Sequence, residues 1–269
     1  MSQFCSLLEK LWACDPKTPW RLDLRNVGYL GPDAAALTYA AWHRARLAGC
    51  KAEVLLPTAP PPLAAFCTFS GLNHTLAKGQ RPAPDHPECE TVPLAHFYQA
   101  QRTHALGVTR LVKRHLPELS RDTSFYLETS LAEVTQNIED HAASPLGGVL
   151  CARFMSGSGQ VRVAVVDHGI GIPNAIRSVR PGITDVRAVE VALKGGTTSR
   201  PNTRNQGLGL QTLSQIVYNS RGDLLILSSR VQAVQRLDEA TPTVSASSFD
   251  FPGTALFFRL NVVAKPFDR

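Results

Sequence analysis

Two polar residues, Glu133 and Asn137, stand four positions apart in the segment EVTQNIEDH (133–141). On a helix this spacing puts both side chains on one flank, about 6 Å apart along the axis. A carboxylate so placed can orient a water or a hydroxyl as a general base, and a carboxamide oxygen suits a hard cation such as Mg²⁺. A solvated polar flank would have the same composition, so the helix alone leaves both interpretations open.

A glycine turn follows an apolar strand and begins with a carboxylate, in DHGIGI (167–172). Gly169 and Gly171 would let the backbone pass close to a flat ring. Asp167, at the end of the strand, could accept a hydrogen bond from an exocyclic amine such as that of adenine.

A second glycine turn, NQGLGL (205–210), runs into an apolar helix. The backbone N–H groups and the positive end of such a helix favour an anion at the turn. The segment before it is basic and rich in hydroxyls, and it contains Lys194 and Thr197. The candidate ligand-binding residues of this region are Lys194, Thr197, Gly207, Leu208, Gly209 and Leu210.

The elements that must position these residues can be read from periodicity. Residues 126–143 form a helix whose apolar stripe, Leu127, Leu131, Val134 and Ile138, must face a sheet. Residues 149–166 read as two strands joined by a Gly/Ser turn, and 94–119 as a helix rich in Arg, Lys and His. The strands 222–229 and 253–262 form a hairpin-like pair joined by a polar segment of low order.

The first part of the chain reads as strand, helix and strand, at 21–30, 31–49 and 51–57, with a short helix at 61–76. A βαβ unit of this kind implies a parallel pair with the helix packed across it. The proline-rich stretch 77–93 has the composition of a linker. We therefore expect two domains, 1–92 and 93–269.

Taken together, the polar helix, DHGIGI, NQGLGL and PGTALFF (252–258) resemble the boxes of the GHKL superfamily, the histidine kinase-like ATPases, over roughly 124–262. The resemblance implies ATP and Mg²⁺ as cofactors, with Glu133 as the catalytic base and Asn137 as the metal ligand. It further implies that Asp167, with Gly169 and Gly171, binds adenine, that the second turn binds phosphates under a lid at about 182–206, and that Thr254 closes the adenine side. For Thr254, an ordinary strand residue with a satisfied hydroxyl is the alternative.

Residues 21–76 resemble the STAS domain of bacterial anti-sigma-factor antagonists, although the turn that carries the regulatory serine in that family here reads Gly31-Pro32-Asp33-Ala34. The fold class expected is therefore α/β: a STAS-like βαβ domain followed by a GHKL α/β sandwich with a mixed sheet.

Composition narrows the class of protein. The net charge of +6 suggests nucleic acid at first sight, but no basic run interleaved with aromatic residues is present, so we do not expect it as a partner. No apolar run is long enough to cross a bilayer, and no signal peptide is recognisable, so we expect a cytoplasmic protein without a membrane partner. The six scattered cysteines form no CxxC pair.

We expect a protein that binds Mg-ATP and regulates a protein partner, by phosphotransfer to a Ser or Thr as in the anti-sigma-factor serine kinases. Transfer to a histidine would need no base, whereas water or a serine hydroxyl benefits from one such as Glu133. Two alternatives stay open: an ATP-hydrolysing switch or clamp, and a nucleotide-sensing adaptor without turnover. Whether the chain forms a homodimer is also left open.

Overall fold

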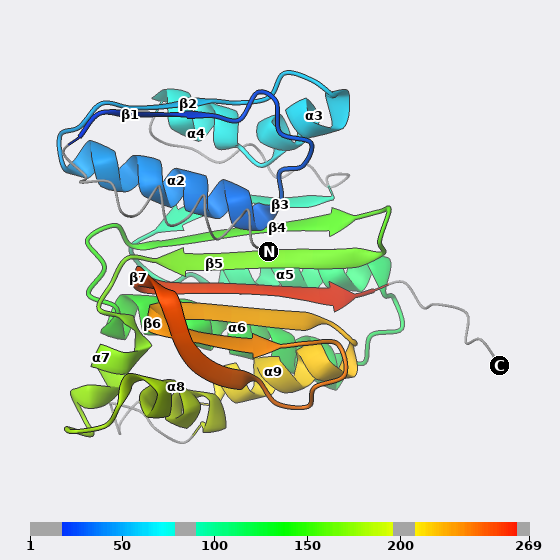
Figure 1. Ribbon diagram of the computed structural model, residues 1–269. Coiled ribbons are helices and arrows are strands. Elements are labelled where there is room, and N and C mark those ends of the chain that lie inside the picture. Colours follow the sequence, from blue (N-terminus) through cyan, green and yellow to red (C-terminus); the bar gives the residue numbers. More distant parts are fainter. Residues whose placement is uncertain (1–17, 79–89, 196–207, 263–269) are drawn as a thin grey trace.

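A five-stranded sheet lies at the centre of the computed structural model, which describes residues 18–78, 90–195 and 208–262 (Figure 1). Every neighbouring pair in this sheet is antiparallel. In their order across the sheet the strands are β3 (Thr91–Phe97), β4 (Gly148–Met155), β5 (Gln160–Asp167), β7 (Thr243–Asn261) and β6 (Asp223–Gln235).

The prediction of a mixed sheet for the second domain is wrong, because the parallel pair in the described part of the chain forms a separate small sheet. The physical reason lies in the connections. The links from β4 to β5 and from β6 to β7 are short turns, and such connections join only antiparallel neighbours. The coarse class, α/β, is confirmed.

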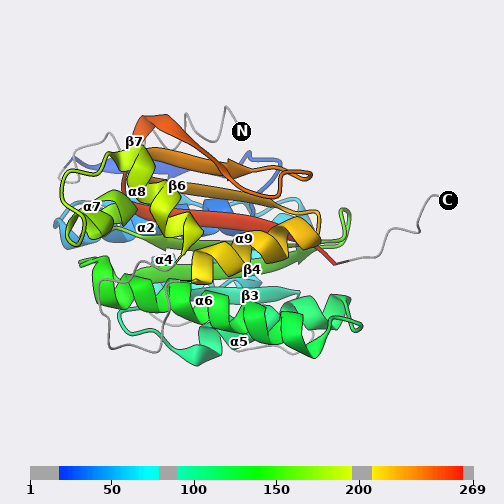
Figure 2. The same ribbon diagram turned by 90° about the horizontal axis from the view of Figure 1, so that it is seen from below.

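Helices cover one face of the sheet. α6 and α9 lie side by side across it, with α5 next to α6 (Figure 2). The predicted apolar stripe of α6 is confirmed, since Leu127, Leu131, Val134 and Ile138 are all buried in this core. α6 begins earlier than predicted because the Ser120 hydroxyl caps it, accepting the N–H of Thr123 at 3.0 Å. The helices of this part are α5 (Arg102–His115), α6 (Arg121–His141), α7 (Gly171–Arg177), α8 (Asp185–Lys194) and α9 (Gly209–Asn219).

The N-terminal unit covers the opposite face. As predicted, two parallel strands flank a helix, but the single short helix predicted over 61–76 is instead two shorter helices. α2 is almost completely buried, because it lies between the small parallel sheet and strands β4 and β5 of the large one (Figure 1). Its many alanines allow this close approach on both sides. The elements are β1 (Trp20–Asp23), α2 (Pro32–Leu47), β2 (Ala52–Leu55), α3 (Pro61–Phe69) and α4 (Leu72–Lys78).

The prediction of a helix over 94–119 is wrong for its first residues. Residues 91–97 instead form β3, an edge strand that pairs with β4, and the helix begins at Arg102. β3 crosses the predicted boundary between 92 and 93, and Leu94 packs with residues of the N-terminal unit. The rings of His104 and His115 of α5 pack against Phe97 and Phe154.

The hairpin of β6 and β7 is much longer than predicted. The polar segment expected to be of low order is itself paired, for example Val231 with Ala246 and Ala233 with Val244. Alternation explains the pairing, since Val231 and Ala233 are buried while the residues between them are more exposed.

Within the three described ranges, none of the helices combines the length and the apolar character that a membrane span requires.

The position of α2 gives a stability prediction. Ala36 is fully buried, so Ala36→Leu should overpack the helix and lower the free energy of unfolding by about 2 kcal/mol. Ala48→Leu at the exposed end of the same helix is the matched control. Urea unfolding followed by circular dichroism measures both variants, and equal stability of the two would contradict the buried position of α2.

Candidate functional site

Asp167 is a buried carboxylate at the end of β5, with 5% of its surface exposed. Its Oδ1 accepts the N–H of Gly169 at 2.7 Å, and the N–H of Thr254 also donates to the carboxylate. Burial raises the pKa of Asp167 to about 7, and the two backbone donors act in the opposite direction. A buried carboxylate that backbone N–H groups hold in one orientation can accept a further hydrogen bond from a ligand donor.

The glycines of this turn permit close contacts between backbone segments. A Cβ at Gly169 would lie 1.9 Å from the carbonyl oxygen of Ala142, at the end of α6. Opposite the turn, β7 bulges at Gly253, which has φ of +98° and packs against the carbonyl of Asp167. Gly171, with φ of +76°, begins α7. Both predicted glycines and Thr254 therefore lie around Asp167.

Ser228 of β6 also belongs to this group, although the sequence did not single it out. Its hydroxyl is fully buried and accepts the N–H of Ile172 at 2.8 Å. It also lies 3.0 Å from the carbonyl of Gly253, to which it donates, and 3.1 Å from the hydroxyl of Thr254. Ser228 thus ties the start of α7 to the bulge of β7. The Thr254 hydroxyl is satisfied by this contact. This agrees with the alternative given for Thr254, an ordinary strand residue with a satisfied hydroxyl.

Glu133 contacts the second glycine turn at the point where it runs into α9. Its Oε2 accepts the N–H of Gly209, the first residue of α9, at 2.7 Å. A Cβ at Gly209 would lie 2.8 Å from the Cβ of Glu133, so a larger residue would not fit. The N–H that the sequence assigned to a phosphate is therefore bonded to a carboxylate in this structure.

Both glycine turns meet the same helix, α6. The first does so where the N–H of Ile170 donates to the carbonyl of Ala142 at 2.7 Å, and the second does so at Glu133. Nine residues separate these contacts, or about 13 Å along the axis. Asn137 lies between them and is exposed. The two turns and the two predicted polar residues thus meet at one helix, between Glu133 and Ala142.

The other predicted phosphate residues are less well connected. Leu208 is exposed and Leu210 packs against the core. Lys194 is the exposed last residue of α8, and no described contact joins it to Asp167 or Glu133. Thr197 and Gly207 lie outside the described residues.

The N-terminal unit lies close to this site at His168, the residue after Asp167. The side chain of His168 is buried beside Asp167 in the chain, and burial lowers its pKa to about 3. The charge of Arg44 and the nearby His43, both from the end of α2, act in the same direction. The end of α2 and the turn that follows Asp167 are therefore close neighbours.

Within the described ranges, no group of three or more His, Cys, Asp or Glu residues is arranged to hold a metal ion. A cation here would need oxygens from a ligand in addition to Asn137.

A scan against models of protein families found no match, and a search of the curated proteins found none either. Function is therefore inferred from the residues of the site.

The buried carboxylate predicts a pH dependence of stability. The pKa of Asp167 is about 7 in the folded protein and near 3.8 when unfolded, so the folded state binds the proton more tightly. The stability that this group contributes is present below pH 4 and is lost as the pH rises through 7, by about 4 kcal/mol at most.

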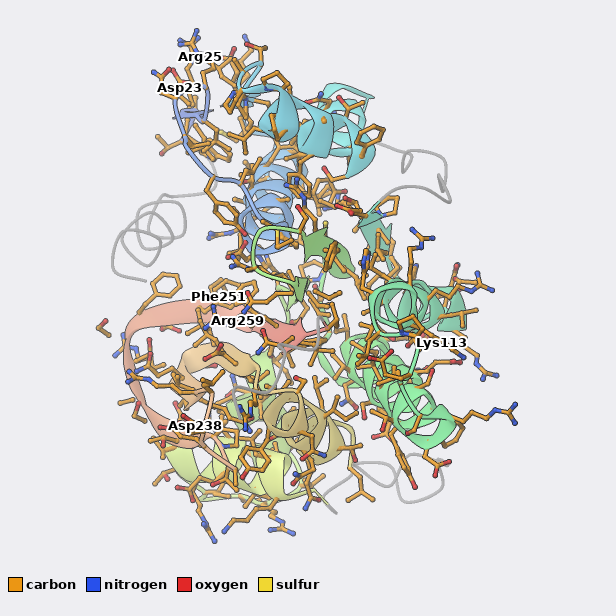
Figure 3. All side chains as sticks on the ribbon, turned by 90° about the vertical axis from the view of Figure 1, so that its right-hand side faces the viewer. Asp23, Arg25, Lys113, Asp238, Phe251 and Arg259 are labelled. Atoms are coloured by element: carbon orange, nitrogen blue, oxygen red, sulfur yellow. The ribbon has the colours of Figure 1, made fainter. Side chains whose placement is uncertain are left out.

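The Asp167→Asn variant should not show this loss of unfolding free energy as the pH rises. The difference in unfolding free energy between wild type and variant, measured in urea at pH 5 and pH 8, isolates it from the histidines that both proteins share. Asp238→Asn, at an exposed position between β6 and β7 (labelled in Figure 3), should follow the wild type. A constant difference between wild type and Asp167→Asn would contradict the burial of the charge.

Proposed function

We propose that this protein binds Mg-ATP along the flank of α6 and uses it to regulate a protein partner, by phosphotransfer to a Ser or Thr of that partner. One observation carries the proposal. Two glycine turns from distant parts of the chain contact one helix about 13 Å apart, with Asn137 between them and Glu133 at one contact. An extended nucleotide has its base and its phosphates at opposite ends, as this arrangement requires.

At the first turn, adenine would meet Asp167. The backbone donors of Gly169 and Thr254 fix the carboxyl group, so it can accept the exocyclic amine without reorganising. The hydroxyl of Ser228 holds Thr254 and the start of α7 in place through its hydrogen bonds to Thr254 and Ile172.

At the second turn, phosphate and Glu133 would compete for the same donor. A phosphate that takes the N–H of Gly209 displaces the Oε2 of Glu133. The released carboxylate then lies next to the phosphates, where it can orient the hydroxyl that attacks. Binding of the nucleotide and activation of the base are therefore one event in this proposal.

The exposed carboxamide of Asn137 fits a Mg²⁺ ion that keeps most of its ligands as waters and phosphate oxygens. The ion would neutralise charge on the phosphates and help to position them.

The resemblance to the anti-sigma-factor serine kinases supports a protein hydroxyl as the acceptor. The presence of a carboxylate base agrees with it, because an imidazole acceptor needs none. Hydrolysis with water as the acceptor, in a switch or clamp, uses the same residues.

One contact favours a second candidate, an adaptor that senses the nucleotide without turning it over. The bond from Gly209 to Glu133 gives that carboxylate a purely structural use, as a cap for α9. If the bond persists when the nucleotide binds, Glu133 activates nothing.

Labelled ATP with Mg²⁺ separates these candidates. We expect Glu133→Ala to bind ATP at least as tightly as the wild type, because a competing negative charge is removed, and to lose turnover by at least a hundredfold. Glu139→Ala is the matched control, since Glu139 lies on the same helix and also accepts one backbone N–H, from Ala100 at 2.7 Å.

Binding is measured by calorimetry, and turnover by ADP release and by label on copurifying proteins. Label on a partner supports the kinase, and ADP without labelled protein supports the clamp. Binding without turnover in the wild type supports the adaptor. Equal turnover in wild type and Glu133→Ala would refute the role of the base, and failure of ATP to bind would refute the nucleotide site.

A further inference from the structure

Three arginines occupy directly opposite positions on neighbouring strands, on the face of the sheet that the N-terminal unit covers. Arg153 of β4 pairs with Arg162 of β5, and Arg162 pairs with Arg259 of β7. Asp223 of β6 continues the row. Like charges placed opposite one another destabilise a sheet. Such a row therefore needs negative charge from elsewhere.

Only part of this charge is balanced within the described residues. Arg259, labelled in Figure 3, forms an ion pair with Asp223. Arg153 lies over the ring of Phe66, 4.6 Å from its centroid, and no carboxylate of the described chain lies within ion-pair distance of it or of Arg162. Two guanidinium groups thus lie in a half-buried place without an ion pair, and the charge of Asp33 acts on Arg162 from a longer distance.

Arg162 also has donor capacity to spare. It donates through Nη1 to the hydroxyl of Tyr29 at 2.8 Å, and through Nη2 to Gln160 at 3.4 Å. Its Nε is buried and has no hydrogen-bond partner. An unsatisfied buried donor is costly, and more so when it is charged. Because Tyr29 accepts from Arg162, its own proton is available to another acceptor.

The first turn of α2 completes the surroundings. Gly31 has no side chain to cap this helix, and the N–H groups of Asp33 and Ala34 donate instead to the carboxylate of Asp33. Asp33 is the one acidic group here, and its Oδ1 is buried without a hydrogen-bond partner. Burial raises the pKa of Asp33, while its backbone hydrogen bonds and the charge of Arg162 act in the opposite direction.

We propose that Arg153 and Arg162, together with the hydroxyl of Tyr29, form a binding site for a phosphate group between the N-terminal unit and the sheet. Two forked guanidinium groups and a hydroxyl offer more donors than a carboxylate could accept, which suits a tetrahedral anion with several oxygens. The site lies five residues along β5 from Asp167, or about 17 Å, at the end of the sheet that faces the viewer in Figure 3. It is independent of the proposed nucleotide pocket.

The test is calorimetric titration with inorganic phosphate at constant ionic strength and pH 7.5. Arg162→Gln and Arg153→Gln should each weaken phosphate binding about tenfold or more, since each removes a charged donor. Arg162→Lys, which keeps the charge and loses the fork, should fall between. Arg230→Gln is the matched control, because Arg230 is an exposed arginine of β6 whose ion pair with Asp250 lies elsewhere.

The site is supported if the wild type and Arg230→Gln bind phosphate with equal affinity and Arg162→Gln or Arg153→Gln binds it more weakly. If Arg162→Gln does not fold, as judged by circular dichroism, Arg153→Gln decides. No phosphate binding up to 10 mM (roughly the range in which one charged pair alone would act), or equal binding in all variants, overturns the site. Acetate binding as tight as phosphate overturns the assignment to a phosphate group.

Discussion

Apart from the row of charged residues at one end, the five-stranded sheet is apolar on both faces, and the rest of the molecule depends on this constraint. Antiparallel sheets often leave one face in water, but here Val161, Val163 and Val165 of β5 face the helices while Ala164 and Val166 face the N-terminal unit. Each face therefore needs a cover. The side chains toward α2 include small ones, which lets a helix rich in alanine approach closely. The helices on the other face rest on larger side chains, and their ends frame the candidate site.

The parts of the fold that follow from local periodicity were predictable from the sequence. The stripe of α6, the hairpin of β4 and β5 and the βαβ unit are of this kind, because each depends on the spacing of residues within one segment. β3 was not predictable, because its strand form depends on pairing with β4, about 50 residues away. The two-sided burial of α2 was missed for the same reason. Its alanines indicated a helix but not the second sheet against it.

In the candidate site, too, some residues were predictable from the sequence and others were not. Asp167 and its glycines stood out by type and spacing, and the structure brings them together with Thr254. Ser228 gave no signal, because a serine in an apolar strand becomes informative only when its three partners, from distant segments, are known. The bond between Glu133 and Gly209 joins residues 76 apart, and it changes what the carboxylate does before any ligand arrives.

α2 connects two places that are far apart on the sheet. Its first turn lies beside Tyr29 and Arg162, and its last turn lies near His168 on the turn that follows Asp167. Sixteen residues of helix, about 24 Å, separate these ends. α2 therefore packs against residues of both places. If a ligand at the arginines changes affinity near Asp167 by some factor, thermodynamic linkage requires that a ligand near Asp167 change affinity at the arginines by the same factor.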